Sequence, residues 1–355
     1  MPGLVDTHSH VGGGRGGDSS APVQPDVRIL DSINVRDAGL RKCVAGGLTT
    51  LNIMPGSGLL VGGQTVYVKL RRGNTIDDIL YRDADGRPLG GLKMANGTNP
   101  QRDAPFPGTR GKAAAIVRQK FTAAREYRRK MAEPDESKRP PRDLEMESLG
   151  ECLEGRRVVH HHTHRADDIL TVLRLREEFG FRVVLHHVSE AWKVTGELAR
   201  AGVPCSVIIV DSPGGKIEAM DMSLATCGLL EEAGVPCAIH TDDPITDSRL
   251  FLRSAALAVR AGMSREKALE AVTLAGARML DLQSRVGSLE PGKDADIVLL
   301  SGDPFSVRTK VLGTWVEGVR VFDLDSAEDR LLAVGGYGAG RDQHAEWCCA
   351  GGDYR

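Results

Sequence analysis

One repeated unit constrains the fold of this chain more than any other feature of its sequence. In this unit an amphipathic helix closes on glycine and a short apolar strand follows at once, as in EEFGFRVVL, ARAGVPCSVIIV and EEAGVPCAIH. A helix that ends on glycine and leads into a buried apolar run is typical of a βα unit in a parallel sheet. Four consecutive units are predicted, with strands at residues 158–162, 182–187, 205–210 and 237–241. The chain is therefore expected to have an α/β fold.

Strands outside this run bring the expected set to a full barrel. Three lie upstream, in GLVDTHSH, LTTLNIMPG and GLKMANG, and TVYVKL at residues 65–70 is a further candidate. Parallel strands in this number, with helices between them, favour a closed (β/α)8 barrel of the TIM type, which routinely reaches this length as one domain. We therefore predict a barrel over residues 1–284.

The pattern changes after the barrel. Residues 285–323 alternate short apolar runs with turn residues, which predicts a small antiparallel sheet. Residues 324–355 end in a glycine-rich stretch with little apolar periodicity, and we expect this C-terminal tail to be mobile.

Composition limits the class of partner. The 46 basic and 48 acidic residues give a formal net charge of −2, which provides no general attraction to nucleic acid or to a membrane surface. The basic runs RRGN and EYRRK are short, and the sequence contains neither a run of about 18 apolar residues nor a signal peptide. Seven cysteines without a CxxC pair argue against both a disulfide framework and a zinc–thiolate site. A cytoplasmic protein with a small-molecule substrate is expected.

The histidines are concentrated where chemistry is expected in such a barrel. Nine of the ten lie in four clusters, each at the C-terminal end of a predicted strand. In a parallel barrel these ends share the face that carries the active site. His8 and His10 are two residues apart on a strand, so both imidazoles point to one side and can bind the same ion. A pair of buried, hydrogen-bonded histidines is the alternative.

Strand alternation sorts the histidines of the middle strands. His162 lies nearest the strand end among those that share its face, which makes it the predicted metal ligand, and His164 the predicted substrate contact. Only one of His186 and His187 is expected to face inward. The later position favours His187 as a ligand and leaves His186 a structural role.

Asp242 and Lys93 complete the candidate ligand set. Asp242 follows the last strand in HTDDP, where a carboxylate beside imidazoles can bind metal and also transfer a proton. Lys93 lies in an apolar strand, and burial would lower the pKa of its amine. A neutral amine can add CO2 to become a carbamate that bridges two metals. A lysine that reaches solvent or a substrate carboxylate is the alternative.

Further candidates for holding the substrate lie in presumed loops on the same face. Arg165, Gln64 and Lys216 join His164 in this group. Each also fits an ordinary surface residue, and for Lys216 the surface is the favoured interpretation.

Taken together, these motifs resemble the amidohydrolase superfamily of metal-dependent hydrolases over residues 1–323. The resemblance is carried by PGLVDTHSH, the two middle histidine clusters, HTDDP and GSLEPGKDADIVLL. GSGLLVGGQ, GLKMANGTNP and HHHTHRADDI are most similar to its imidazolonepropionase-related and prolidase-like branch. The resemblance implies a TIM barrel with a β-sandwich built from both chain ends. It also implies metal ligands at His8, His10, His162, His187 and Asp242, and a carboxylated lysine at Lys93.

The sequence departs from the family pattern at its start. Family members normally carry a segment before the HxH strand that builds half of the sandwich, whereas this sequence begins at that strand. Only the C-terminal part of the sandwich, residues 285–323, is therefore expected. Alternating residues such as Ile297, Val316 and Val321 would then lack cover, which favours a homodimer or a soft sheet.

Three functions follow as hypotheses. The leading one is hydrolysis of a C–N bond in a small amide, cyclic amide or dipeptide by metal-bound hydroxide, with Asp242 as general acid and base. One or two divalent ions, with Zn2+ the expected metal, would serve as cofactor. A mononuclear deaminase would use the same ligands without Lys93. A catalytically impaired barrel would act only in binding.

Overall fold

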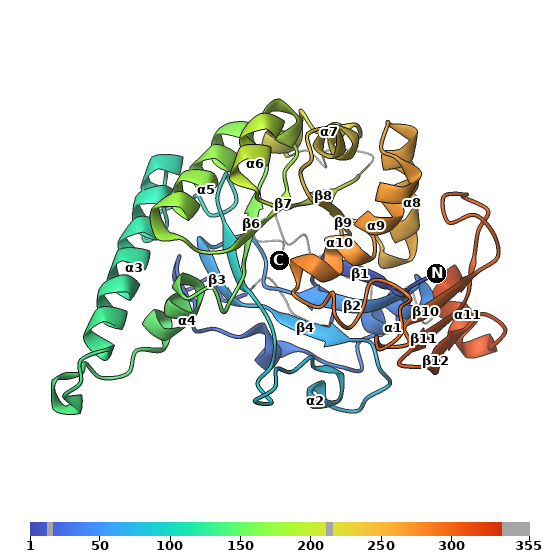
Figure 1. Ribbon diagram of the computed structural model, residues 1–355, viewed down its shortest axis with the longest axis horizontal. Helices are drawn as coiled ribbons and strands as arrows, with labels where there is room; N and C mark the ends of the chain where they lie inside the picture. The colour runs from blue at the N-terminus through green and yellow to red at the C-terminus, as the bar shows by residue number, and fades with distance from the viewer. Residues whose placement is uncertain (13–16, 211–215, 336–355) are drawn as a thin grey trace.

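A computed structural model describes residues 1–12, 17–210 and 216–335 of the chain (Figure 1). Short strands line the interior of the molecule and helices cover them on the outside. The interior strands are β1 (Leu4–Ser9), β2 (Leu48–Ile53), β3 (Val61–Gln64), β4 (Val66–Lys69), β5 (Leu92–Ala95), β6 (Val159–Thr163), β7 (Val183–His187), β8 (Cys205–Ile208) and β9 (Cys237–His240).

Hydrogen bonds join these strands into a closed barrel. Strands β3, β5, β6, β7, β8 and β9 form one sheet in that order, and β1, β2 and β4 form another. On one side the sheets meet where the Asp242 amide donates to the His8 carbonyl at 2.9 Å. On the other side the Thr65 amide, between β3 and β4, donates to the Gly91 carbonyl at 2.9 Å. The TIM-type barrel expected from the sequence is confirmed.

A buried carboxylate fastens the first strand to the last. Asp6 on β1 accepts hydrogen bonds from the His8 amide at 3.1 Å and from the Thr241 amide at 3.2 Å. It also accepts from the Thr241 hydroxyl. Burial raises the pKa of Asp6 to about 7, while these donors act in the opposite direction. The side chain thus fixes the register of β1 against the residues that follow β9.

The prediction that all the barrel strands run parallel is wrong at one position. Strand β4 pairs antiparallel with β2, and β3 pairs antiparallel with β5. The segment between β2 and β3 contains no helix, so the chain turns back directly. Parallel neighbours need a crossover of a dozen or more residues, whereas antiparallel neighbours do not. As a result the start of β3, rather than its end, lies beside the C-terminal ends of the other strands.

The outer layer consists of helices of seven or more residues, most of them visible around the barrel in Figure 1. They are α1 (Ala38–Ala45), α3 (Arg110–Met131), α4 (Leu144–Leu153), α5 (Ala166–Phe179), α6 (Thr195–Ala201), α7 (Thr226–Glu232), α8 (Phe251–Arg260) and α9 (Arg265–Ala271). The shorter α2 (Ile76–Ile79) and α10 (Leu274–Met279) also flank the barrel. Within the described ranges, no helix has both the length and the apolar character needed to cross a bilayer.

The glycines of the repeated unit end helices as expected. Gly180, Gly202 and Gly234 have φ values of 77°, 61° and 72°. A Cβ atom added at any of them would meet nothing within 4 Å. The requirement for glycine at these positions is therefore conformational, because left-handed backbone is costly for residues with a side chain.

A small antiparallel sheet follows the barrel. It consists of β10 (Ile297–Leu300), β11 (Val311–Val316) and β12 (Val319–Asp323), paired in that order. Residues at the start of the chain border β10, where the Val298 amide donates to the Met1 carbonyl at 2.9 Å. The Thr314 hydroxyl on β11 donates to the Val44 carbonyl at 2.7 Å and so joins the sheet to α1.

The two faces of this sheet differ in exposure. Val316 and Val321 are buried, at 2% and 7% exposure, so the expectation that they lack cover is wrong. They lie on the face that packs on the rest of the chain. Ile297 and Val319 are 38% and 61% exposed, as expected for side chains that alternate across a strand.

A helix occupies the first part of the expected mobile tail. Helix α11 (Ala327–Val334) begins at Ser326, whose hydroxyl caps the Asp329 amide at 3.4 Å. The Arg41 guanidinium of α1 pairs with Glu328 at 2.9 Å and with Asp329 at 3.1 Å. These capping and ionic contacts hold residues 327–334 in place. Residues 336–355 lie outside the described part of the chain.

A fully buried lysine joins the barrel to the small sheet. The Lys69 ammonium at the end of β4 pairs with Asp294, with Asp296 at 3.2 Å and with Glu317 at 3.7 Å. Arg285 also pairs with Asp294, at 2.8 Å. A buried ammonium is tolerated only when it is paired, because burial removes its hydration.

We predict that Lys69→Met destabilises the protein by about 3–5 kcal/mol, because it leaves the buried Asp296 carboxylate without its cation. The midpoint of urea unfolding, followed by circular dichroism, measures this. Lys267→Met is the matched control. Lys267 pairs with Glu270 at 2.7 Å with its side chain 52% exposed, and such pairs contribute less than about 1 kcal/mol. Equal effects of the two substitutions would contradict the structural role given to Lys69.

Candidate metal centre

Four polar side chains from distant parts of the sequence meet at the C-terminal ends of the strands. The Asp242 Oδ1 atom lies 3.0 Å from His10 Nε2 and 3.3 Å from His8 Nε2. The Lys93 Nζ atom on β5 lies 3.0 Å from His8 Nε2. We call His8, His10, Lys93 and Asp242 the first cluster. The structure thus brings together four of the residues that the sequence proposed as ligands.

The protonation of His10 shows that this cluster fits a cation. The Nδ1 atom of His10 lies 2.7 Å from the Met54 carbonyl oxygen, which only accepts hydrogen bonds. Nδ1 therefore carries the proton in the neutral ring, and Nε2 presents a lone pair to the Asp242 carboxylate. Two acceptors at this distance repel each other unless a cation or an additional proton lies between them. Metal-binding histidines commonly show this arrangement, with the second ring nitrogen bonded to a backbone carbonyl.

The charge states of the cluster also suit a metal. Burial and the charge of Lys93 lower the pKa of His8 well below its ordinary value, so the ring is neutral at pH 7. Burial alone would raise the pKa of Asp242, but nearby positive charge outweighs burial and holds this pKa below its ordinary value. Neutral imidazoles and an ionised carboxylate are the forms that bind divalent ions.

A second cluster consists of His162, His164 and His187. The ring centroids of His162 and His187 are 4.3 Å apart, and those of His162 and His164 are 4.7 Å apart. Among the described residues, His162 Nδ1 and His187 Nε2 are buried without a hydrogen-bond partner. Buried ring nitrogens are seldom left in this state, which makes these atoms candidate ligand positions. His187 Nδ1 lies 3.8 Å from Asp242 Oδ2 and so connects the two clusters.

The backbone is strained at the two residues that connect the clusters. His187 has a φ of 71° and Asp242 a φ of 53°, a region that non-glycine residues rarely adopt. Such strain costs about 1–3 kcal/mol and is concentrated at functional sites. It follows that both residues are held in place by the surrounding structure.

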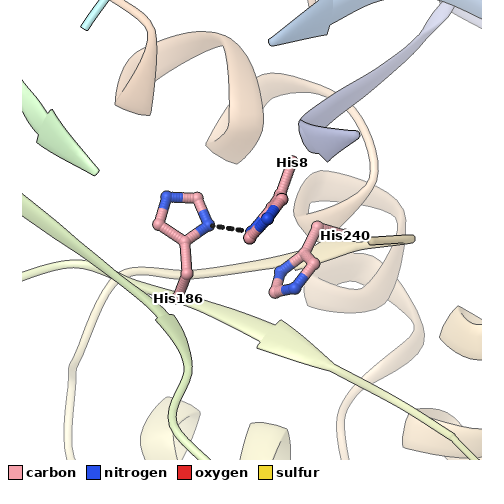
Figure 2. Close-up of side chains that lie close together, drawn as sticks. All are labelled: His8, His186 and His240. Carbon is pink, nitrogen blue, oxygen red and sulfur yellow. Dashed lines mark hydrogen bonds between the residues drawn. The ribbon is translucent and has the colours of Figure 1, made fainter. Parts of the chain in front are cut away.

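The left-handed turn at His187 also overturns one sequence prediction. Only one of His186 and His187 was expected to face inward, yet both do. His186 Nδ1 lies 3.3 Å from His8 Nδ1, and Figure 2 shows this contact beside His240. The positive φ at the end of β7 breaks the alternation of the strand and turns His187 toward the same side.

Two of the proposed substrate contacts do not join the clusters. The Gln64 amide donates to Pro25 and Ser148, and Gln64 pairs with Leu92 at the far end of β5. The sequence placed it in a loop on the active face, but the antiparallel direction of β3 carries it to the other end. Arg165 pairs with Asp167 at 2.9 Å, and its side chain is 44% exposed.

The structure places further residues at the site that the sequence did not predict there. Lys216, expected at the surface, has its Nζ atom 3.2 Å from His162 Nε2 and 2.9 Å from Glu218 Oε1. The Asn99 amide lies 3.3 Å from the same histidine nitrogen. Asn99 and Glu218 lie in segments without hydrophobic periodicity, so no sequence pattern marked them. His240, whose Nε2 atom lies 3.2 Å from His187 Nδ1, is marked only by its place at a strand end.

Known proteins resemble this chain in sequence and in fold. A family model described as the amidohydrolase family matches residues 151–322. The amidohydrolase tasK of Hapsidospora irregularis is 28% identical over 356 residues, which cover 90% of this chain and 36% of tasK. An imidazolonepropionase from Rhizorhabdus wittichii is 33% identical over 107 residues, 29% of this chain and 25% of the relative. The chain thus spans about a third or less of the length of these curated relatives.

A solved structure extends the likeness to the whole described fold. The crystal structure of an amidohydrolase from Thermotoga maritima superposes with a TM-score of 0.85 at 36% sequence identity. The match covers 91% of this chain and 87% of the Thermotoga chain. Identity at this level over most of both chains shows common ancestry as well as a common fold. This chain therefore belongs to the amidohydrolase family.

Proposed function

We propose that this chain hydrolyses a C–N bond in a small amide, cyclic amide or dipeptide. The observation that carries the proposal is the meeting of His8, His10 and Asp242, with the His10 tautomer set by Met54 so that acceptor atoms converge. A divalent metal held by these three residues would supply a water molecule of lowered pKa and would polarise the scissile carbonyl. The partial match to an imidazolonepropionase supports a cyclic amide as one substrate class.

The ligand roles follow from the two clusters. His8, His10 and Asp242 would hold one ion, and His162 and His187 would contribute to a second. Lys93, 1% exposed on β5, would offer anionic oxygen atoms as further ligands after addition of CO2 to its amine. Zn2+ is the metal that best suits this set of imidazoles and a carboxylate.

Asp242 is the proposed general acid and base. Its Oδ1 atom faces His10, and its Oδ2 atom points toward His187 in the second cluster. A carboxylate between the clusters can take a proton from the attacking water and deliver it to the leaving nitrogen. The lowered pKa of Asp242 keeps the carboxylate ionised at pH 7, which is the form that can bind a metal and accept a proton.

His164 and Lys216 are the proposed contacts for the substrate. His164 is 6% exposed in the second cluster, and its Nδ1 atom lies 2.7 Å from the Ser189 hydroxyl. Lys216 lies beside His162 and places a cation at the edge of the cluster. Together they would orient the polar end of a small substrate through hydrogen bonds.

We expect Asp242→Asn to fold and to retain metal at one or both clusters, while hydrolysis slows at least about a hundredfold because the proton carrier is lost. Initial rates on a panel of cyclic amides, acylated amino acids and dipeptides provide the measurement. Asp243→Asn is the control, because the Asp243 carboxylate faces Ser248, 2.6 Å away, rather than the clusters. A rate for Asp242→Asn within tenfold of the wild type would remove this residue from the mechanism.

The double substitution of His8 and His10 by Ala should release most bound metal, since both rings belong to one ion's ligand shell. Metal content is measured by mass spectrometry of the purified protein after dialysis. The wild type is expected to hold near two divalent ions per chain. A content near one favours the deaminase alternative, and full retention by the double variant would refute the ligand assignment.

A further inference from the structure

We propose that His186, His160 and Tyr67 form a hydrogen-bonded chain inside the barrel that orients His8 and fixes its tautomer for metal binding. The proposal rests on the proposed function only in taking His8 as a metal ligand. His186 contacts the Nδ1 atom of His8, whereas the Nε2 atom of His8 faces the first cluster, so we assign His186, His160 and Tyr67 as positioning residues.

The contacts run from the first cluster into the middle of the barrel. His8 Nδ1 lies 3.3 Å from His186 Nδ1, and His186 Nε2 lies 2.9 Å from His160 Nδ1. His160 Nε2 lies 3.0 Å from the Tyr67 hydroxyl. The four residues come from β1, β7, β6 and β4, and none is more than 4% exposed. Figure 2 shows the first contact, with the His186 ring directed at His8.

Once His8 binds metal, every hydrogen bond in this chain has the same donor-to-acceptor direction. A neutral imidazole has one donor and one acceptor nitrogen. When His8 Nε2 gives its lone pair to an ion, Nδ1 carries the proton and donates to His186 Nδ1. His186 then carries its own proton on Nε2 and donates to His160 Nδ1. His160 in turn donates from Nε2 to the Tyr67 hydroxyl, which accepts.

Burial supports neutral groups throughout this chain. His160 and His186 are both 0% exposed, and a buried charge without a counter-ion is costly. Burial raises the pKa of the Tyr67 hydroxyl, so this end of the chain remains protonated. Each imidazole therefore has the single proton that the alternating pattern requires.

A glycine preserves the space for the chain. A Cβ atom added at Gly91 would lie 2.2 Å from His160 Cδ2 and 2.7 Å from His160 Nε2. The same Cβ atom would lie 2.6 Å from the Val158 carbonyl oxygen, so both the neighbouring backbone and the position of the His160 ring require glycine here. The GG pair before Lys93 therefore contains one residue whose small size serves the histidine on the neighbouring strand.

Filling a barrel interior with polar side chains costs free energy, because each buried polar group needs a hydrogen-bond partner. Barrel interiors are usually filled by Val, Ile and Leu side chains, which need no hydrogen-bond partners. Here buried imidazoles and a hydroxyl lie within hydrogen-bonding distance of one another. A comparable chain supports the second cluster, since His187 Nδ1 lies 3.2 Å from His240 Nε2 and His240 Nδ1 lies 2.9 Å from Ser206 Oγ. In both chains the nitrogen away from the interior is the candidate ligand atom.

The test compares two substitutions at His186. His186→Leu removes both hydrogen bonds, and we expect the Zn2+ dissociation constant to rise about 10- to 100-fold, the usual cost of losing such a partner of a ligand. His186→Gln keeps an acceptor for His8 and a donor for His160, so its affinity should stay close to that of the wild type. Both are measured by competition with a chromophoric chelator. His161→Leu is the control. His161 is also buried, but its Nδ1 atom bonds the His162 carbonyl and takes no part in the hydrogen-bonded chain from His8 to Tyr67.

The possible outcomes separate this inference from the proposed function. Wild-type affinity in folded His186→Leu, or equal losses in His186→Leu, His186→Gln and His161→Leu, would overturn the positioning role. Metal retention by His8→Ala would instead overturn the ligand assignment itself. Should His186→Leu fail to fold, the 15N shifts of the zinc-loaded wild type still decide. They should show the Nδ1–H tautomer at His8 and the Nε2–H tautomer at His186, and a proton on His186 Nδ1 would refute the chain.

Discussion

The junction between the first and last barrel strands is the contact on which the site depends. Asp6 on β1 accepts from the Thr241 amide and hydroxyl, and this buried carboxylate fixes the register of two segments more than 230 residues apart. The same register brings the Asp242 carboxylate within 3.3 Å of His8 and within 3.0 Å of His10. Closure of the barrel and assembly of the first cluster are therefore one event, because a shift at this junction would separate the carboxylate from both imidazoles.

The interior of the barrel shows how stability and function are balanced. Apolar side chains would fill this space without hydrogen-bonding requirements, yet His160, His186 and His240 occupy it. Burial keeps these rings neutral, and each finds partners among other buried polar groups. The strained backbone at His187 and Asp242 adds a further cost at the mouth.

Much of the fold could be predicted because its signals are local. The glycines at 180, 202 and 234 end helices through a backbone conformation that depends on neighbouring residues alone. The direction of β3 and β4 is different, since it depends on whether a helix fits between consecutive strands. Helix α11 was not predicted, because it is only eight residues long and a glycine-rich segment without apolar periodicity follows it.

The sequence by itself determined that His8 and His10 share a face, that histidines gather at strand ends and that Asp242 follows the last strand. These properties depend on the two-residue period of a strand and on chain order, which are local. Only the tertiary structure decided that His186 and His187 both face inward and that Lys216 reaches His162. It also decided that Gln64 lies at the end of the barrel opposite the clusters. A positive φ, an antiparallel strand and a loop conformation are imposed by packing against distant segments, and no local pattern encodes them.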